Sequence, residues 1–89
     1  MTKDELRALI LSEISNIAPD VDPSSLPPDA DIREALDFDS MDVMNLIIAL
    51  HKKLSVDIPD RDAPKFVTLD GAVDYLAQKL RIMGGTTHE

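Results

Sequence analysis

The 89-residue chain contains no cysteine, so it forms no disulfide and offers no thiolate as a metal ligand or nucleophile. It has no apolar run near the roughly 18 to 20 residues that a membrane-spanning helix needs. The segment Met1 to Glu5 lacks the basic start and apolar stretch of a signal peptide. We therefore expect a cytoplasmic protein of one domain, because the length suffices for one domain and not for two.

Basic residues are scarce: nine lysines and arginines accompany 17 aspartates and glutamates, giving a formal charge of −8. Nucleic-acid binding needs clustered basic side chains that neutralise phosphates, so the composition argues against a nucleic-acid partner. An acidic domain is better suited to proteins with basic surface patches, because its charge accelerates their encounter. The acids concentrate between residues 18 and 39, where Arg33 is the only base.

Aromatic residues make up only 3% of the chain, whereas 44% of it is hydrophobic. This hydrophobic content is periodic, which excludes general disorder and predicts a mostly aliphatic core. Helical spacing predicts helices at about residues 3–17, about residues 40–54, and from residue 69 to the Gly84–Gly85 pair. The apolar faces consist of Leu6, Leu9, Ile10, Ile14 and Ile17; Val43, Leu46, Ile47, Leu50 and Leu54; and Leu69, Val73, Leu76 and Leu80.

Local signals predict where the helices begin and end. Thr2 has capping-box spacing to Glu5, while Asp39 and Thr68 are suited to cap the second and third helices. Prolines interrupt residues 18–38, although an apolar pair four residues apart predicts that this long loop is pinned to the core and contains a helical turn. Residues 56–59 should be extended and residues 60–65 a single turn. We expect an all-α fold without strand pairing: a small three-to-four-helix bundle with a long loop between helices one and two.

Ser40 is the residue of greatest chemical interest. It lies at the start of a predicted helix, after Asp39 and between the apolar residues Phe38 and Met41. The positive end of the helix dipole and the free N–H groups of the first turn favour a phosphate attached there. Nearby carboxylates oppose added negative charge unless a cation is present, and they suit a Mg²⁺-dependent transfer onto the hydroxyl.

Ser40 and its surroundings admit other interpretations. Serine is common at helix starts, so position alone favours a structural role for Ser40 over a modified residue. A calcium loop counted from Asp37 fails, because its fifth, sixth and twelfth positions are Met41, Asp42 and Ile48. On a continuous helix, a histidine 11 residues from Ser40, His51, lies about 16 Å away and is excluded as its base. The chain lacks a catalytic set, and we expect no enzyme.

The segment from Leu36 to Met41 resembles the attachment motif of acyl carrier proteins, Leu-Gly-apolar-Asp-Ser-apolar. The resemblance extends over nearly the whole chain. Glu34 to Leu36 is similar to the acidic lead-in, Val56 to Asp60 to the signature after the second helix, and Thr68 to Leu80 to the last helix. Three pieces in this order and at this spacing make the resemblance specific.

The resemblance implies a carrier in which a phosphopantetheinyl transferase attaches 4′-phosphopantetheine to Ser40. Asp39 would orient that reaction and hold Mg²⁺ transiently, with no stable metal site. The arm would carry acyl thioesters between enzymes of fatty-acid, polyketide or a specialised acyl pathway, and the bundle interior would shelter the acyl chain. Residues 1–83 would form the carrier domain of a monomer, with 84–89 as a flexible tail.

The resemblance also implies that partner enzymes with basic patches recognise the helix at 40–54 and its surroundings. The expected partner-recognition residues are Asp37, Phe38, Met41, Asp42, Met44, Asn45 and Asp60. Taken by themselves, the two methionines are more often packing residues than part of a site.

The sequence differs from the acyl carrier protein pattern in two respects. Asp37 replaces the usual glycine, and aspartate adopts unusual backbone angles less easily than glycine does. The helix at 40–54 has Asp42 as its only acid and carries Lys52 and Lys53, whereas fatty-acid carriers are rich in glutamate there. A dedicated pathway with its own partners is therefore an equal alternative, and an unmodified acidic interaction module remains a second hypothesis. Peptidyl carriers, which have paired glycines before the serine, rank lower.

Overall fold

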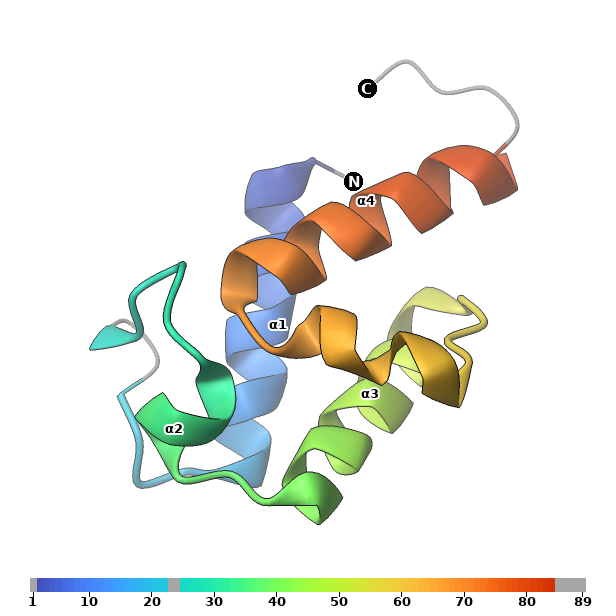
Figure 1. The fold of residues 1–89 in the computed structure, drawn as a ribbon. Helices are drawn as coiled ribbons and strands as arrows, with labels where there is room; N and C mark the ends of the chain where they lie inside the picture. The colour runs from blue at the N-terminus through green and yellow to red at the C-terminus, as the bar shows by residue number, and fades with distance from the viewer. Residues whose placement is uncertain (1, 23–24, 85–89) are drawn as a thin grey trace.

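The computed structural model describes residues 2–22 and 25–84. Within them the chain is helical, without strands, and contains one isolated bridge between Asp31 and Thr68. The elements follow in the order α1 (Lys3–Ile17), α2 (Ile32–Leu36), α3 (Ser40–Leu54), the 3-10 helix η2 (Asp60–Phe66) and α4 (Leu69–Gly84) (Figure 1). The expected all-α bundle is confirmed, and α2 is the helical turn expected inside the long loop.

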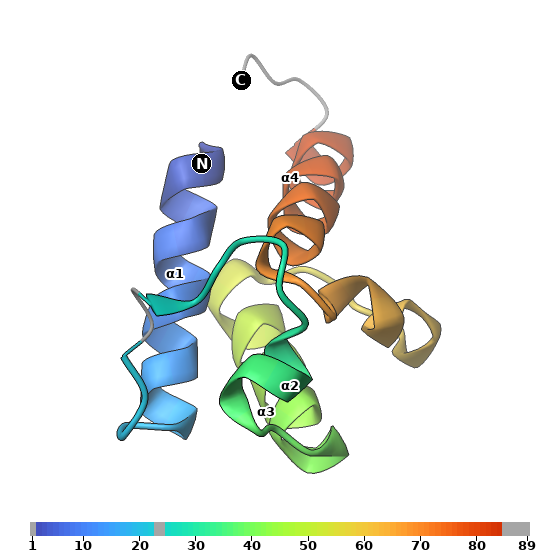
Figure 2. The ribbon, with the colours of Figure 1, turned by 60° about the vertical axis from the view of Figure 1, so that its left-hand side comes forward.

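The three long helices enclose the core. Helix α1 packs against both α3 and α4, and η2 packs against α3 and α4 (Figure 2). Because each apolar face turns inward, the members of the predicted stripes are buried or half-buried. The fully buried ones include Leu6, Ile10, Ile14, Leu46, Leu50 and Leu76.

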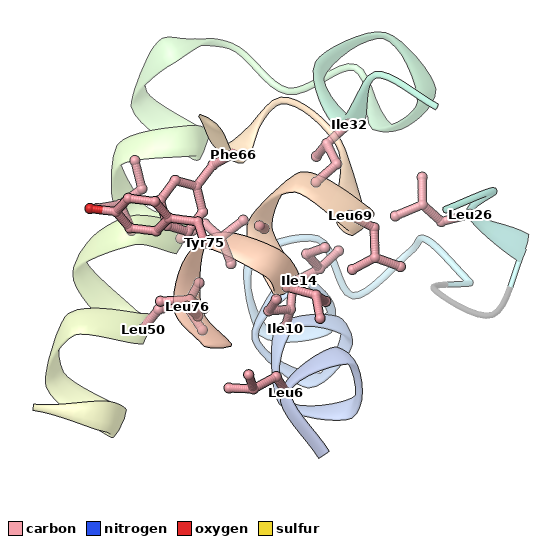
Figure 3. Packing of buried hydrophobic residues seen from close by; sticks show 14 of the residues in the cluster. Leu6, Ile10, Ile14, Leu26, Ile32, Leu50, Phe66, Leu69, Tyr75 and Leu76 are labelled. Atoms are coloured by element: carbon pink, nitrogen blue, oxygen red, sulfur yellow. The ribbon is translucent and has the colours of Figure 1, made fainter. Parts of the chain in front are cut away.

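The core is mostly aliphatic, as expected, yet it also takes in every aromatic side chain of the protein. Phe38, Phe66 and Tyr75 are all buried. The rings of Phe66 and Tyr75 meet edge to face, with centroids 5.2 Å apart and planes inclined at 67° (Figure 3). Sequence periodicity missed this pair because Phe66 belongs to η2 and Tyr75 lies beside the predicted stripe of α4.

Side-chain caps begin the first and last helices as predicted. The Thr2 hydroxyl accepts a hydrogen bond from the Glu5 N–H at 3.1 Å, and the Glu5 carboxylate accepts one from the Thr2 N–H at 2.8 Å. The Thr68 hydroxyl accepts one from the Gly71 N–H at 2.9 Å. These bonds satisfy backbone donors that a helix start leaves without partners.

The long loop is fastened to the junction between η2 and α4. The Ile32 N–H donates to the Val67 carbonyl at 2.7 Å, and the Asp70 N–H donates to the Pro28 carbonyl at 3.0 Å. Leu26 adds a buried side chain to the core (Figure 3). The loop therefore holds α2 beside the end of η2, although the two are far apart in sequence.

None of the described helices combines the length and apolar composition that a membrane crossing requires. Gly84, which we expected to begin the tail, is the last residue of α4. The expected tail beyond it, with His88, lies outside the described residues.

Candidate functional site

Ser40 is the first residue of α3 and is exposed. Asp39 precedes it as the N-cap: its carboxylate accepts a hydrogen bond from the Asp42 N–H at 2.9 Å. In return, the Asp42 carboxylate accepts one from the Asp39 N–H at 3.2 Å. A helix start leaves its first N–H groups without helical partners, so the N–H groups of Ser40 and Met41 remain available to an anion. The cap thus presents the hydroxyl outward at the positive end of the helix.

The short segment before Ser40 is shaped by Asp37. Its backbone is left-handed, with φ 56° and ψ 39°, and it ends α2. The Phe38 N–H then donates to the Arg33 carbonyl at 3.0 Å. A left-handed turn at a helix end is the conformation for which glycine is preferred, and aspartate tolerates it better than most residues do. Asp37 therefore keeps the conformation that a glycine adopts easily.

A pocket of about 300 Å³ adjoins Ser40. Its walls come from α2, from the first turns of α3, and from η2 with the residue after it. The lining residues are Arg33, Ser40, Val43, Met44, Ala63, Pro64, Phe66 and Val67. Apart from the serine and the arginine, all of these side chains are apolar. The volume is at the small end of ligand-binding pockets, so it suits a short or partly inserted apolar group.

Arg33 is held at this pocket by Asp31. The Nε–Oδ1 contact is 3.5 Å and the Nη2–Oδ2 contact is 3.4 Å. Asp31 also caps α2, because its carboxylate accepts from the Arg33 N–H at 2.8 Å. The hydrogen bond from the Arg33 side chain is the main reason why the pKa of Asp31 lies below its usual value. The one base of the acidic loop thereby lines the same pocket as Ser40.

The opposite wall, η2, is anchored to α4. The Tyr75 hydroxyl donates to the Asp62 carboxylate at 2.5 Å. Burial, together with this bond, raises the pKa of Tyr75 to about 12, and the same bond lowers the pKa of Asp62. Phe66 packs against the same tyrosine ring. These contacts fix the side of the pocket that faces α3.

The partner-recognition residues predicted from the sequence fall into different environments. Met41 is 66% exposed and Asn45 is exposed. Asp60, the first residue of η2, and Asp37 are exposed as well. Ile48, which sequence reasoning did not select, is 44% exposed. Met41, Asn45 and Ile48 are spaced four and three residues apart, so they share one outer face of α3.

The other predicted residues have structural contacts. Phe38 is only 7% exposed and belongs to the core, so it anchors the loop and presents little surface to a partner. Met44 is half-buried and lines the pocket, and Asp42 is half-buried within the cap. Ile48 carried a sequence signal, because it is a large apolar residue outside the buried stripe. No sequence signal marked the pocket residues of η2, because their position beside α3 depends on tertiary packing.

The geometry of α3 separates His51 from Ser40. Helix α3 is continuous from Ser40 to Leu54, so His51 lies at the opposite end from Ser40. The His51 Nδ1 is 2.6 Å from the Val56 carbonyl oxygen. This contact connects the last turns of α3 to the segment that follows the helix. Within the described part of the chain, no group of three or more histidines or carboxylates is arranged to hold a metal ion.

Comparison with known proteins places this arrangement in a family. The family model described as "Phosphopantetheine attachment site" matches residues 5–76. The acyl carrier protein of Rubrobacter xylanophilus is 40% identical over 75 residues, covering 81% of this chain and 93% of that protein. Acyl carrier protein 2, mitochondrial, of Arabidopsis thaliana is 35% identical over 77 residues, covering 86% of this chain and 60% of that protein. The solved acyl carrier protein of Enterococcus faecalis superposes with a TM-score of 0.74 at 30% identity, covering 89% of this chain and 99% of that one.

The geometry around Ser40 fits the group that this family carries. An exposed hydroxyl, unpaired helix N–H groups and a mostly apolar pocket suit a phosphate followed by a flexible, largely uncharged arm. Acyl carrier proteins are carriers that serve enzyme partners and are not enzymes themselves. The chain belongs to the acyl carrier protein family, whose phosphopantetheine-binding domain carries a covalently attached 4′-phosphopantetheine.

Proposed function

We propose that Ser40 is the attachment residue and that the arm carries acyl thioesters between partner enzymes. The observation that supports this most strongly is the exposed Ser40 hydroxyl at the capped start of α3, beside a small apolar pocket. When bound, the arm supplies the thiol that this cysteine-free chain lacks. Tethering raises the effective concentration of the acyl group at each partner without requiring tight binding between proteins.

Asp39 has two roles in this proposal. Its carboxylate caps α3 and so holds Ser40 at the helix start. During modification the same carboxylate would help to hold Mg²⁺ while the Ser40 Oγ attacks the pantetheine-bearing phosphorus of coenzyme A. The pyrophosphate bond breaks, adenosine 3′,5′-bisphosphate leaves, and the transferase takes up the hydroxyl proton. The second Asp39 oxygen remains open to a cation, because the cap uses Oδ1. We propose no resident metal.

We further propose that enzymes with basic patches dock on the outer face of α3 and the acids beside it. Met41, Asn45 and Ile48 supply the contact face, and Asp37 and Asp60 supply negative charge nearby. Charge of this kind chiefly raises the rate of encounter and selects partners. Phe38 anchors the loop to the core, and Met44 forms part of the pocket wall.

The pathway is fatty-acid, polyketide or specialised acyl synthesis, and the carrier works as a cytoplasmic monomer in this proposal. The far end of α3 favours dedicated partners, because exposed Lys52 and Lys53 replace the acids that general fatty-acid carriers have there. The pocket beside Ser40 would shelter a short acyl chain or the first part of a longer one.

The decisive experiment is modification in vitro. Incubation with a phosphopantetheinyl transferase, coenzyme A and Mg²⁺ should raise the intact mass by one phosphopantetheine. Ser40→Ala should abolish the increase. Ser12→Ala, which alters an exposed serine in the middle of α1, should leave it intact.

The absence of a mass increase with several unrelated transferases, and on protein from the native source, would favour an unmodified interaction module. The replacement of the family glycine by Asp37 is one reason to consider that alternative. This reason loses weight because Asp37 keeps the left-handed backbone that glycine adopts easily.

A further inference from the structure

We infer that Arg33 is the phosphate-binding residue of the modified protein. In this inference, which rests on Ser40 being the attachment residue, the guanidinium binds the phosphodiester on Ser40 and directs the start of the arm across the pocket.

Geometry supplies the first argument. Ser40 and Arg33 line the same pocket of about 300 Å³. A phosphorus atom bonded to the Ser40 Oγ is therefore carried by a residue of the pocket wall. Arg33 is the only charged side chain in the lining, which is otherwise apolar except for the serine. An arginine has a long side chain and donates in a fork that matches phosphate oxygens.

Electrostatics supplies the second argument. A phosphodiester on Ser40 is surrounded in sequence by Glu34, Asp37, Asp39 and Asp42, all of which oppose another negative charge. The helix end offsets this only in part, because its dipole amounts to about half a positive charge. Arg33 is the one base between residues 18 and 39, and it lies on the pocket side of α2. It is therefore the base of this acidic segment that can offset the charge of the phosphate.

The contacts of Arg33 supply the third argument. Its pairing with Asp31, at 3.4 and 3.5 Å, is longer than the 2.7–2.9 Å of a strong charge-assisted bond. These contacts use Nε and Nη2, so the Nη1 donors remain for a ligand. The side chain is 53% exposed and has room to turn. Asp31 thus keeps Arg33 near the pocket while leaving donors for the phosphate.

The test compares unmodified and fully modified protein for the wild type, Arg33→Gln and Arg61→Gln. Arg61 is an exposed base of η2 outside the pocket lining, so its variant loses the same charge without touching the site. Two quantities are measured: the change in melting temperature on modification, and the ³¹P chemical shift of the phosphodiester. The shift in melting temperature on modification should be about 4 °C lower for Arg33→Gln than for the wild type. The ³¹P chemical shift of the phosphodiester should also differ between these two proteins. Arg61→Gln should match the wild type in both.

Measurement of the intact mass distinguishes a failure of the proposed function from a failure of the proposed role of Arg33. If wild-type protein gains no mass, the proposed function fails and the inference fails with it. If all three proteins gain the mass but Arg33→Gln and Arg61→Gln behave alike, the role of Arg33 is disproved and the attachment at Ser40 stands. Arg33→Lys, which keeps the charge and loses the fork, should recover part of the melting-temperature change.

Discussion

Asp37 and Ser55 are the non-glycine residues of the described chain with a positive φ, at 56° and 55° respectively. Each ends a helix, Asp37 after α2 and Ser55 after α3. A side chain in this region crowds the following carbonyl, and serine is less tolerant of it than aspartate. The family glycine at the position of Asp37 is thus explained by backbone geometry at one helix end.

We therefore expect Ser55→Gly to raise the free energy of unfolding by about 1 kcal/mol, and Asp37→Gly to raise it by less. Urea unfolding followed by circular dichroism measures both. Ser12→Gly, placed in the right-handed interior of α1, should instead lower stability by about 0.5–1 kcal/mol. Equal losses in all three variants would show that the left-handed residues carry no strain.

At the scale of elements, the start of α3 combines folding with presentation of the site. One reciprocal pair of hydrogen bonds between Asp39 and Asp42 caps the helix and leaves Ser40 exposed beside it. The two roles of Asp39, as cap and as charge, can be separated because asparagine caps a helix about as well as aspartate does.

Asp39→Asn should keep the wild-type stability but slow modification at least tenfold, since it retains an oxygen acceptor and loses the negative charge that holds Mg²⁺. Asp39→Ala should slow modification and also cost about 1 kcal/mol of stability. Urea unfolding and a time course of intact mass measure the two effects. If Asp39→Asn is modified at the wild-type rate, Asp39 acts only as the cap of α3.

At the scale of the whole molecule, a formal charge of −8 on a small domain opposes folding through self-repulsion. Attractive pairs exist, such as Lys3–Asp74 at 2.9 Å, but both partners are largely exposed and such pairs contribute little. Repulsion should therefore outweigh attraction among the surface charges.

Raising the NaCl concentration from about 10 mM to about 200 mM should increase the melting temperature by several degrees, equivalent to about 1 kcal/mol. Tetramethylammonium chloride at the same ionic strength should act equally, because screening does not depend on the cation. A fall in melting temperature would mean that the surface ion pairs dominate, and an effect of sodium alone would indicate cation binding.

Local sequence signals are sufficient to predict the features that depend on near neighbours. Helix periods, the caps at Thr2, Asp39 and Thr68, and the helical turn inside the long loop are all local, because each requires contacts only a few residues apart. The exposed position of Ser40 at the start of α3 follows from the same local signals.

Other features depend on packing between segments that are far apart in the chain, and no local pattern predicts them. The burial of Phe66 against Tyr75, the pocket between α2, α3 and η2, and the presence of Arg33 in its wall arise from packing across the fold. Phe38, read from the sequence as a recognition residue, lies in the core for the same reason. Hydrophobic burial is non-directional, so a sequence pattern shows which side chains avoid water but not which partners they meet.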